Sequence, residues 1–303
     1  MFVADAHCDT LYSIAVEGRS PADCAVTPAR LAEGGVGLQT FAMFSGSGER
    51  AARAHENGRA MLAAIDRLGV PMHSGRLPDA PPDAPSGVLS IEGGEMIGGS
   101  LDLLAEFDDA CRVRMLALTW NYENEIGFPA ASGSDRGLKP FGRELLAEMG
   151  KRGVLPDVSH LNEAGFWEVA EHSPLPPIAS HSNLKSLCGH ARNLTRDQVR
   201  AIVGRGGFIG INFYANFLVD EGDAAIDDVV RHIDAIAELG GIGVLGFGSD
   251  FDGINRWPGG LGDPSRFPAL IEALRRRGYA GEDLGGICGM NLWRLLKRAE
   301  AGA

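Results

Sequence analysis

Leu155-Pro156-Asp157-Val158-Ser159-His160 is a short apolar run that ends in a histidine and then turns polar. Ile178-Ala179-Ser180-His181-Ser182 repeats this pattern a little further along the chain. A buried parallel strand whose carboxyl end carries a working side chain has this form. Ala4-Asp5-Ala6-His7-Cys8-Asp9 near the start and Gly246-Phe247-Gly248-Ser249-Asp250 near the end are similar. The four stretches together predict a metal site assembled from strands that are distant in sequence.

Eight such apolar runs alternate with segments of helical periodicity along the chain. The expected strands cover residues 2–8, 36–44, 87–92, 113–118, 154–158, 177–180, 207–213 and 242–248. The expected helices cover residues 49–68, 101–107, 141–149, 162–170, 195–203, 226–239, 264–277 and 289–299. This alternation predicts an α/β fold, a (β/α)8 TIM-like barrel, with residues 1–303 as one metallohydrolase domain. A doubly wound open sheet is the competing architecture, but no G-x-G-x-x-G motif follows the first strand.

Size, charge and cysteine content narrow the functional class. With 303 residues, 45% of them hydrophobic, the chain is long enough for one large barrel core. The formal net charge of −12 argues against nucleic acid or an anionic membrane as a partner. Five cysteines without a CxxC pair fit a reducing compartment, and no stretch reaches the ~18 apolar residues of a membrane span. We therefore expect a soluble, cytoplasmic protein.

Five side chains with nitrogen or oxygen donors lie at the expected strand ends. His7 and Asp9 share a face, because side chains at i and i+2 of a strand point the same way. Glu92, His160 and His181 hold equivalent positions on other strands. Imidazole and carboxylate are ligands of catalytic zinc, but five of them exceed what one tetrahedral ion with an open position can use. The set therefore predicts two zinc ions per chain, bridged by Glu92 and a hydroxide and about 3.5–4 Å apart.

Other residues near these strand ends suit roles in catalysis or substrate binding. Asp250 follows the last strand, where it can accept a proton from the hydroxide as a general base. Arg192, in the loop after the sixth strand, can clamp a substrate carboxylate, although a surface ion pair is its competing role. Trp120, Asn121 and Tyr122 lie where a pocket wall is expected, although packing is the default role of such aromatic residues. The remaining five histidines are interpreted as structural.

In the order and spacing of its motifs, the chain closely resembles the membrane dipeptidase (renal dipeptidase) family, the M19 metallopeptidases of the amidohydrolase superfamily. No single motif is decisive, but together they are highly specific and cover nearly the full length. The motifs are His7-Cys8-Asp9, Ile91-Glu92-Gly93-Gly94, Leu118-Thr119-Trp120-Asn121, Asp157-Val158-Ser159-His160, Ser180-His181-Ser182, Ala191-Arg192-Asn193 and Gly248-Ser249-Asp250-Phe251-Asp252-Gly253.

The resemblance implies a distorted (β/α)8 barrel that hydrolyses dipeptides. Family members often accept a D-residue at the carboxyl-terminal position, and many are homodimers. The site residues that the resemblance implies are His7 and Asp9 on one zinc, His160 and His181 on the other, Glu92 on both, Asp250 for the proton and Arg192 for the terminal carboxylate of the substrate.

One position departs from the family pattern. Many members carry a histidine after Leu-Thr in the fourth strand, where it is thought to polarise the scissile carbonyl, and this chain has Trp120 there. An indole N–H donates one hydrogen bond but supplies no positive charge. Losing one donor to a developing oxyanion typically costs ~10²–10³ in rate. Either Asn121 or Asn124 compensates, the metal ions suffice, or the substrate preference has moved.

The sequence thus predicts a cytoplasmic binuclear zinc dipeptidase that acts on dipeptides, including L-D dipeptides, through a bridging hydroxide. Its partner is a small-molecule dipeptide, and the resemblance allows a homodimer. The alternative is another amidohydrolase-type reaction on the same site, on an N-acyl amino acid, a cyclic amide or a lactone. A barrel that binds a ligand without catalysing a reaction is a further alternative. The intact set of metal ligands argues against this alternative, and Trp120 argues for it.

Overall fold

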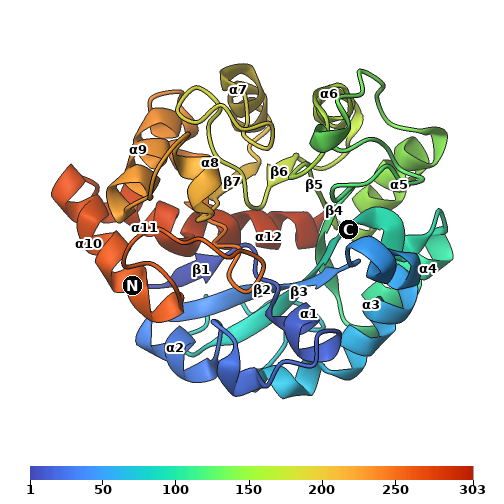
Figure 1. Cartoon of the computed structure of the whole chain (residues 1–303), viewed down its shortest axis with the longest axis horizontal. Coiled ribbons are helices and arrows are strands. Elements are labelled where there is room, and N and C mark those ends of the chain that lie inside the picture. The colour runs from blue at the N-terminus through green and yellow to red at the C-terminus, as the bar shows by residue number, and fades with distance from the viewer. Residues whose placement is uncertain (303) are drawn as a thin grey trace.

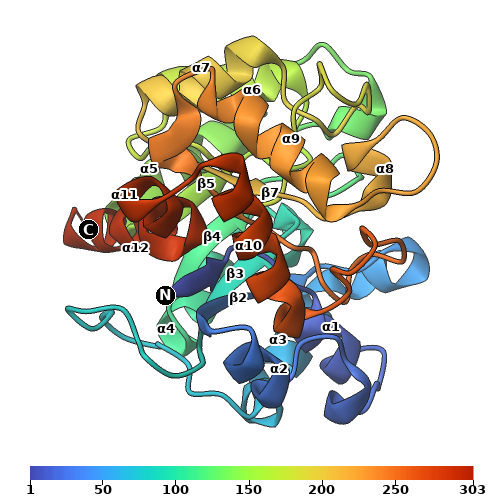
Figure 2. The ribbon, with the colours of Figure 1, turned by 90° about the vertical axis from the view of Figure 1, so that its left-hand side faces the viewer.

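The structure, a computed structural model, describes residues 1–302. Eight parallel strands form a closed barrel in which neighbours along the chain are neighbours in the ring. Helices surround the strands (Figures 1 and 2), and the predicted (β/α)8 barrel is confirmed. The strands are β1 (Val3–Asp5), β2 (Val36–Phe44), β3 (Ser86–Glu92), β4 (Val113–Ala117), β5 (Leu155–Asp157), β6 (Ile178–Ala179), β7 (Phe208–Ile211) and β8 (Leu245–Phe247).

Local sequence signals fix the ends of several helices. Thr27 caps α2 by accepting a hydrogen bond from the backbone N–H of Arg30, and Pro28 takes the first helical position. Thr195 and Gln198 form a capping box at the start of α7. The helices are α1 (Thr10–Ala15), α2 (Pro28–Glu33), α3 (Ala54–Ala63), α4 (Leu101–Ala110), α5 (Pro140–Arg152), α6 (Glu163–His172), α7 (Arg196–Gly204), α8 (Ala215–Leu218), α9 (Ile226–Ala237), α10 (Phe267–Arg277), α11 (Gly281–Gly285) and α12 (Asn291–Ala301). Among residues 1–302, no helix combines the length and hydropathy needed to cross a bilayer.

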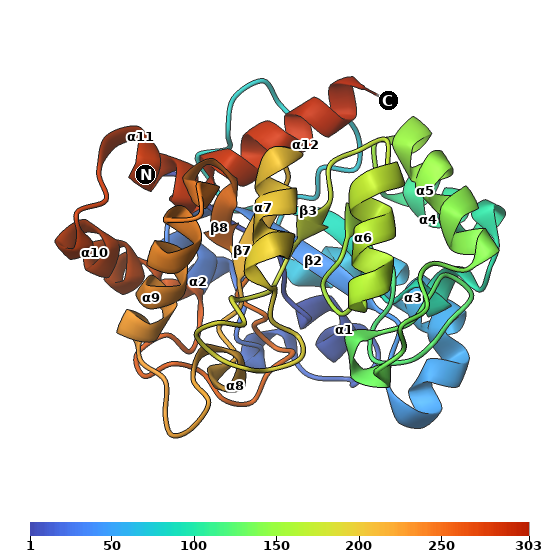
Figure 3. The same ribbon diagram turned by 90° about the horizontal axis from the view of Figure 1, so that it is seen from above.

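The last helix closes one end of the barrel. Side chains of α12, among them Leu292 and Leu296, form one buried apolar cluster with Ala4, Val88 and Met115 from the strands. Figure 3 shows α12 lying across this end of the strands. Because α12 covers the end where the strands begin, the opposite end, where they finish, is left for a functional site.

Several predicted boundaries differ from the structure by a few residues, and two of these differences have a clear physical cause. The helix expected over residues 49–68 is divided into a 3₁₀ segment (Gly48–Arg53), α3 and a second 3₁₀ segment (Ile65–Leu68). Asn57 Nδ2 donates to the carbonyl oxygens of Ser45 (3.1 Å) and Arg50 (2.9 Å), which folds the first segment back toward β2.

The second difference concerns the eighth strand, which the sequence predicts to begin at residue 242. Gly241–Val244 is a 3₁₀ turn, and β8 begins only at Leu245. Asn291 Nδ2 donates to the carbonyl oxygens of Ile242 and Leu245, both at 2.9 Å. The first of these carbonyls is therefore satisfied by α12 instead of a neighbouring strand.

A buried ion pair joins α12 to β4. Arg114, whose side chain is 3% exposed, donates from Nη1 to Glu300 Oε1 at 2.9 Å. The backbone N–H of Leu77 donates to the same oxygen at 2.9 Å. We expect Glu300→Ala to lower the free energy of unfolding by about 3–5 kcal/mol, because it leaves a buried guanidinium without its carboxylate.

Urea unfolding followed by circular dichroism measures this loss. Glu272→Ala is the matched control, since Glu272 and Arg275 form an exposed pair on α10 and such pairs contribute about 0–1 kcal/mol. Equal losses for Glu300→Ala and Glu272→Ala would show that Arg114 does not depend on Glu300.

Candidate metal centre

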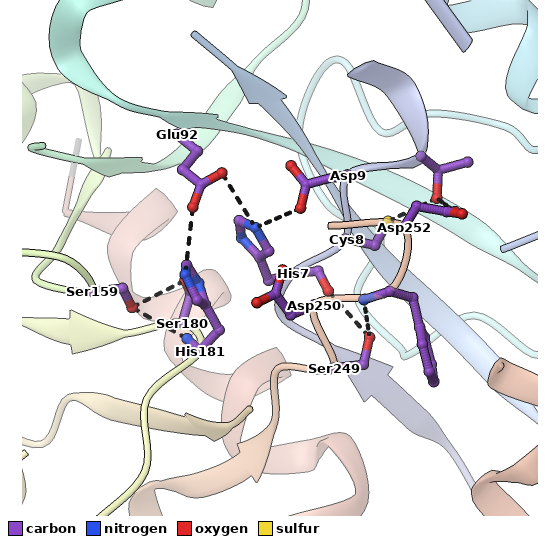
Figure 4. A network of polar contacts seen from close by, with 12 residues as sticks. His7, Cys8, Asp9, Glu92, Ser159, Ser180, His181, Ser249, Asp250 and Asp252 are labelled. Atoms are coloured by element: carbon purple, nitrogen blue, oxygen red, sulfur yellow. Dashed lines mark hydrogen bonds and ion pairs between the residues drawn. The ribbon is translucent and has the colours of Figure 1, made fainter. Parts of the chain in front are cut away.

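Six titratable side chains meet where the strands finish, and Figure 4 shows five of them at close range. Each stands at the end of a strand or within a few residues of it, so the closure of the barrel brings together segments that are far apart in sequence. The structure thus gathers the predicted ligands and the predicted base at one place. They are His7 and Asp9 after β1, Glu92 at the end of β3, His160 after β5, His181 after β6 and Asp250 after β8.

Glu92 divides its two oxygens between two sets of donors. Its Oε2 lies 3.6 Å from His7 Nε2, and the same nitrogen lies 3.5 Å from Asp9 Oδ2. Its Oε1 lies 3.1 Å from His160 Nε2 and 3.4 Å from His181 Nε2. One carboxylate oxygen therefore faces each pair of residues, which is the arrangement of a bridging ligand.

The hydrogen bonds of two histidines fix where their lone pairs point. His160 Nδ1 lies 2.9 Å from Asn121 Oδ1, an acceptor, so the proton sits on Nδ1. Ser180 Oγ donates to Asp157 and therefore accepts from His181 Nδ1, at 2.8 Å. The two Nε2 atoms thus carry lone pairs and lie 3.0 Å apart. Two lone pairs that converge beside a carboxylate oxygen repel one another unless a cation lies among them.

A second group of donors includes His7, whose Nε2 lies beside the other oxygen of Glu92. One donor atom each from His7, Asp9 and Asp250 lie within 4.8 Å of one another. Nε2 of His7 and Oδ1 of Asp9 are buried and have no hydrogen-bond partner among residues 1–302. Because buried polar atoms are normally partnered, these orphaned donors fit a bound cation.

The pKa values of the cluster report an excess of negative charge. Burial lowers the pKa of His7, but Glu92 and Asp9 outweigh burial and hold it well above its usual value. Burial opposes a charge on Glu92, yet His7 and His160 hold its pKa well below its usual range. Burial and the neighbouring carboxylates raise the pKa of both Asp9 and Asp250. A divalent cation would relieve this repulsion.

Comparison with known proteins identifies the family. The family model for membrane dipeptidases, peptidase family M19, matches residues 1–303. The chain belongs to the M19 family. The resemblance drawn from its motifs is therefore confirmed, and the chain is a hydrolase of the metallopeptidase class.

Relatives of this M19 chain come from bacteria and fungi. An uncharacterized protein in the pqqA 5′ region of Klebsiella pneumoniae is 38% identical over 69% of this chain and 80% of its own length. An uncharacterized dipeptidase of Schizosaccharomyces pombe is 34% identical over 70% of this chain. The match spans about half of the yeast protein, 52%.

A solved structure extends the likeness to the whole fold. A metallopeptidase from Rhodobacter sphaeroides, liganded with a phosphinate mimic of the dipeptide L-Ala-D-Ala, superposes with a TM-score of 0.86. The two chains are 28% identical, and the superposition covers 99% of each.

Two residues of the candidate site are held in an uncommon backbone conformation. His160 and Asp250 have φ values of 71° and 65°, in the left-handed region. Such a conformation costs about 1–3 kcal/mol and persists only where its surroundings enforce it. The backbone N–H of Asp250 donates to the carbonyl of His7 at 3.1 Å, and the N–H of Ala130 donates to that of His160 at 2.7 Å.

Two buried carboxylates, Asp5 and Asp157, lie below the predicted ligands, and the sequence-based prediction gave no role to Asp5. Asp5 accepts from the backbone N–H of Ser249 at 2.8 Å and from its hydroxyl at 2.5 Å. Asp157 accepts from the backbone N–H of Ser180 at 3.0 Å, and also from its hydroxyl. Each aspartate thus ties the loop of one ligand to that of a neighbouring strand. The sequence could have indicated Asp5 as a residue that supports the site, because Asp5 and His7 share a strand face.

Asn212 also escaped prediction, although it directly follows β7. Its Nδ2 donates to Asp250 Oδ2 at 2.9 Å. The same strand-end rule that selected the other residues points to this position.

A cavity of about 440 Å³ opens above the metal centre, and Asp9, Glu92, His160 and Asp250 lie in its floor and walls. Trp120 and Asn121 line it, as expected of a pocket wall. Tyr122 does not line this cavity. Its ring packs against Trp120 with centroids 5.4 Å apart, and the residue is exposed to solvent.

Hydrogen bonds bear on whether Asn121 or Asn124 could replace the histidine that this M19 chain lacks at position 120. Asn124 Oδ1 accepts from the backbone N–H groups of Ile126 and Gly127, and its Nδ2 donates to the carbonyl of Leu118. Both ends of the Asn124 amide therefore serve the loop. Asn121 uses its carbonyl oxygen on His160. Asn124 does not line the main cavity, so it is not placed to act as the substitute donor.

Arg192 is buried near the metal centre, but it borders a second cavity of about 200 Å³ instead of the main one. Its Nη1 lies 3.3 Å from Ser182 Oγ, and its guanidinium lies 5.6 Å from the centre of the Phe217 ring, which lines the main cavity. Nε and Nη2 have no partner among residues 1–302. Burial lowers the pKa of Arg192 to about 10, so it keeps its charge at neutral pH.

Proposed function

We propose that this chain is a binuclear zinc dipeptidase. The observation that carries the proposal is the division of the Glu92 oxygens between His7 with Asp9 and His160 with His181. Imidazole nitrogens and carboxylate oxygens are the donors that zinc takes in catalytic sites. When bound, two zinc ions supply a nucleophile derived from water at neutral pH and polarise the scissile carbonyl.

Asp250 would move the proton in this reaction. Asn212 holds its Oδ2, which leaves Oδ1 to accept a proton and return it to the leaving amine. Its raised pKa, caused by burial and by Asp9 and Glu92 beyond the opposing effect of His7, suits a group that both takes and gives a proton. Its proximity to His7 and Asp9 supports a second role, as a ligand.

A dipeptide with a free carboxylate fits the charges around the centre. Nε and Nη2 of Arg192 are the two donors of one edge of the guanidinium, and both are buried without a partner in the described part of the chain. A carboxylate accepts two parallel hydrogen bonds from such an edge. The phosphinate mimic of L-Ala-D-Ala bound by the Rhodobacter sphaeroides relative supports activity on L-D dipeptides.

The site of action that we propose is the cytoplasm. The five cysteines are buried and unpaired in the structure, and free thiols are typical of reducing compartments.

Hydrolysis assays with zinc-loaded protein test the function. A panel of L-L and L-D dipeptides should be cleaved, and N-acyl amino acids, cyclic amides and lactones should not. Cleavage of an N-acyl amino acid or a lactone with no dipeptide turned over would assign the chain to another amidohydrolase-type reaction.

Arg192→Ala should raise the KM for free dipeptides by about 10- to 100-fold, because a hydrogen-bonded charge contributes about 1.5–3 kcal/mol. Dipeptide amides, which lack the carboxylate, should show little change between the two proteins. Arg200→Ala is the control, since Arg200 is exposed on α7 and pairs with Asp197. Equal effects of Arg192→Ala on dipeptides and on dipeptide amides would show that Arg192 does not bind the substrate carboxylate.

A further inference from the structure

Three aromatic rings form a continuous apolar face on one side of the main cavity, which we call the aromatic wall. Tyr12 comes from α1, Phe44 from the end of β2 and Trp120 from the loop after β4, and all three line the cavity. The ring centroids of Tyr12 and Phe44 are 4.9 Å apart, and so are those of Phe44 and Trp120. The metal chemistry proposed above uses none of this surface.

The aromatic wall stands directly beside the metal centre. In the parallel register of β2 and β3, Phe44 pairs with Glu92, the bridging carboxylate. Trp120 lies next to His160, with ring centroids 6.0 Å apart. A substrate whose reacting bond lies at Glu92 therefore has the wall within reach of an adjoining side chain.

Contacts behind the rings also hold the aromatic wall in place. Tyr122 packs edge-on against Trp120, with centroids 5.4 Å apart. The backbone N–H of Gly48, in the segment after β2, donates to the Tyr122 hydroxyl at 3.1 Å. The loops after β2 and β4 are thereby tied together behind the rings, which pre-organises the face that the cavity presents.

The ring order of the barrel decides which end of a dipeptide meets the wall. In a closed ring of eight strands in sequence order, β2 lies opposite β6. Arg192 follows β6, and Phe44 ends β2. If the carboxylate lies at Arg192, as the proposed function holds, a dipeptide that crosses the metal centre carries its amino-terminal residue toward β2.

We propose that the aromatic wall binds the side chain of the amino-terminal residue, so that the preferred substrates are dipeptides with a large aromatic or aliphatic residue at that position. The inference rests on the proposed dipeptidase function. Charged groups at this rim do not favour a charged side chain, because Glu17 and Arg50 already pair with each other at 3.5 Å. Trp120 supplies one of the three rings of this apolar subsite.

The test compares Phe-Ala with Gly-Ala, and Ala-Phe with Ala-Gly, on the zinc-loaded enzyme. Burying a phenylalanine side chain supports a preference of about 10- to 100-fold in kcat/KM for Phe-Ala over Gly-Ala. We expect no comparable preference for Ala-Phe over Ala-Gly. Phe44→Ala should reduce the Phe-Ala to Gly-Ala ratio at least about tenfold.

Two further variants keep the result interpretable. Trp167→Ala removes an exposed ring of α6 that does not line the cavity, and should leave the ratio unchanged. Phe44→Leu keeps an apolar side chain and should give an intermediate ratio, which tests the wall even where Phe44→Ala fails to fold. A wild-type ratio near one, a preference confined to Ala-Phe, or a ratio that both Phe44 variants leave unchanged would overturn the inference while the dipeptidase function stood. Turnover of no dipeptide would overturn both.

Discussion

Replacing Glu92 by glutamine is expected to reduce the zinc content from about two ions per chain to one or fewer. The amide keeps the shape of the carboxylate, but it presents a neutral oxygen to one pair of ligands and an NH₂ group to the other. An NH₂ group has no lone pair to offer a cation. Since even residues that only support a metal ligand typically cost 10–100-fold in affinity or activity, we expect kcat/KM to fall by more than about 100-fold.

Elemental analysis and dipeptide hydrolysis measure the two effects on the same preparation. Glu95→Gln is the matched control, because Glu95 lies three residues further on, is half-buried, and contacts Ser45 Oγ at 3.4 Å without joining the donor cluster. It should keep both ions. A Glu92→Gln protein with two zinc ions and unchanged kcat/KM would refute a bridging role for Glu92.

Asp250→Asn should lower kcat by about 10²–10⁴-fold, the usual contribution of a positioned acid or base. Asparagine keeps an oxygen for the hydrogen bond from Asn212 Nδ2 but cannot accept the proton. If Asp250 acts on the proton alone, the variant retains two zinc ions.

The zinc content of this variant separates the two roles of Asp250. A fall to one ion with the loss of kcat would make Asp250 a ligand that joins His7 and Asp9. A kcat within threefold of the wild-type value would remove Asp250 from catalysis. Asparagine tolerates the left-handed conformation of Asp250, and circular dichroism checks that the variant keeps the overall fold.

The barrel and its ligand positions could be predicted because parallel strands leave a plain signal. Such strands are buried on both faces, so they read as apolar runs, and the polar residues that follow each run stand at the rim. Glu92 and His181 were selected in this way. Because the sheet closes into a barrel, the ends of strands that are far apart in sequence lie at one rim, and the distant motifs meet there.

Other features depend on contacts that no local pattern carries. The 3₁₀ turn before β8 exists because Asn291, from the far end of the chain, satisfies the carbonyl of Ile242. The hydrogen bond from His160 to Asn121 joins two loops, so the sequence indicated only a pocket residue where the structure also shows a partner of a predicted metal ligand. The unpartnered edge of Arg192, and its place beside a second cavity, likewise depend on how the loops pack.

Zinc titration of the metal-free protein, with dipeptide hydrolysis followed at each step, tests whether activity requires two zinc ions. Protein prepared without chelator should contain about two zinc ions per chain. After chelation it should be inactive, and activity should return in full only as the second equivalent of zinc binds. Full dipeptidase activity in the metal-free protein, or full activity with a single ion bound, would contradict the binuclear site.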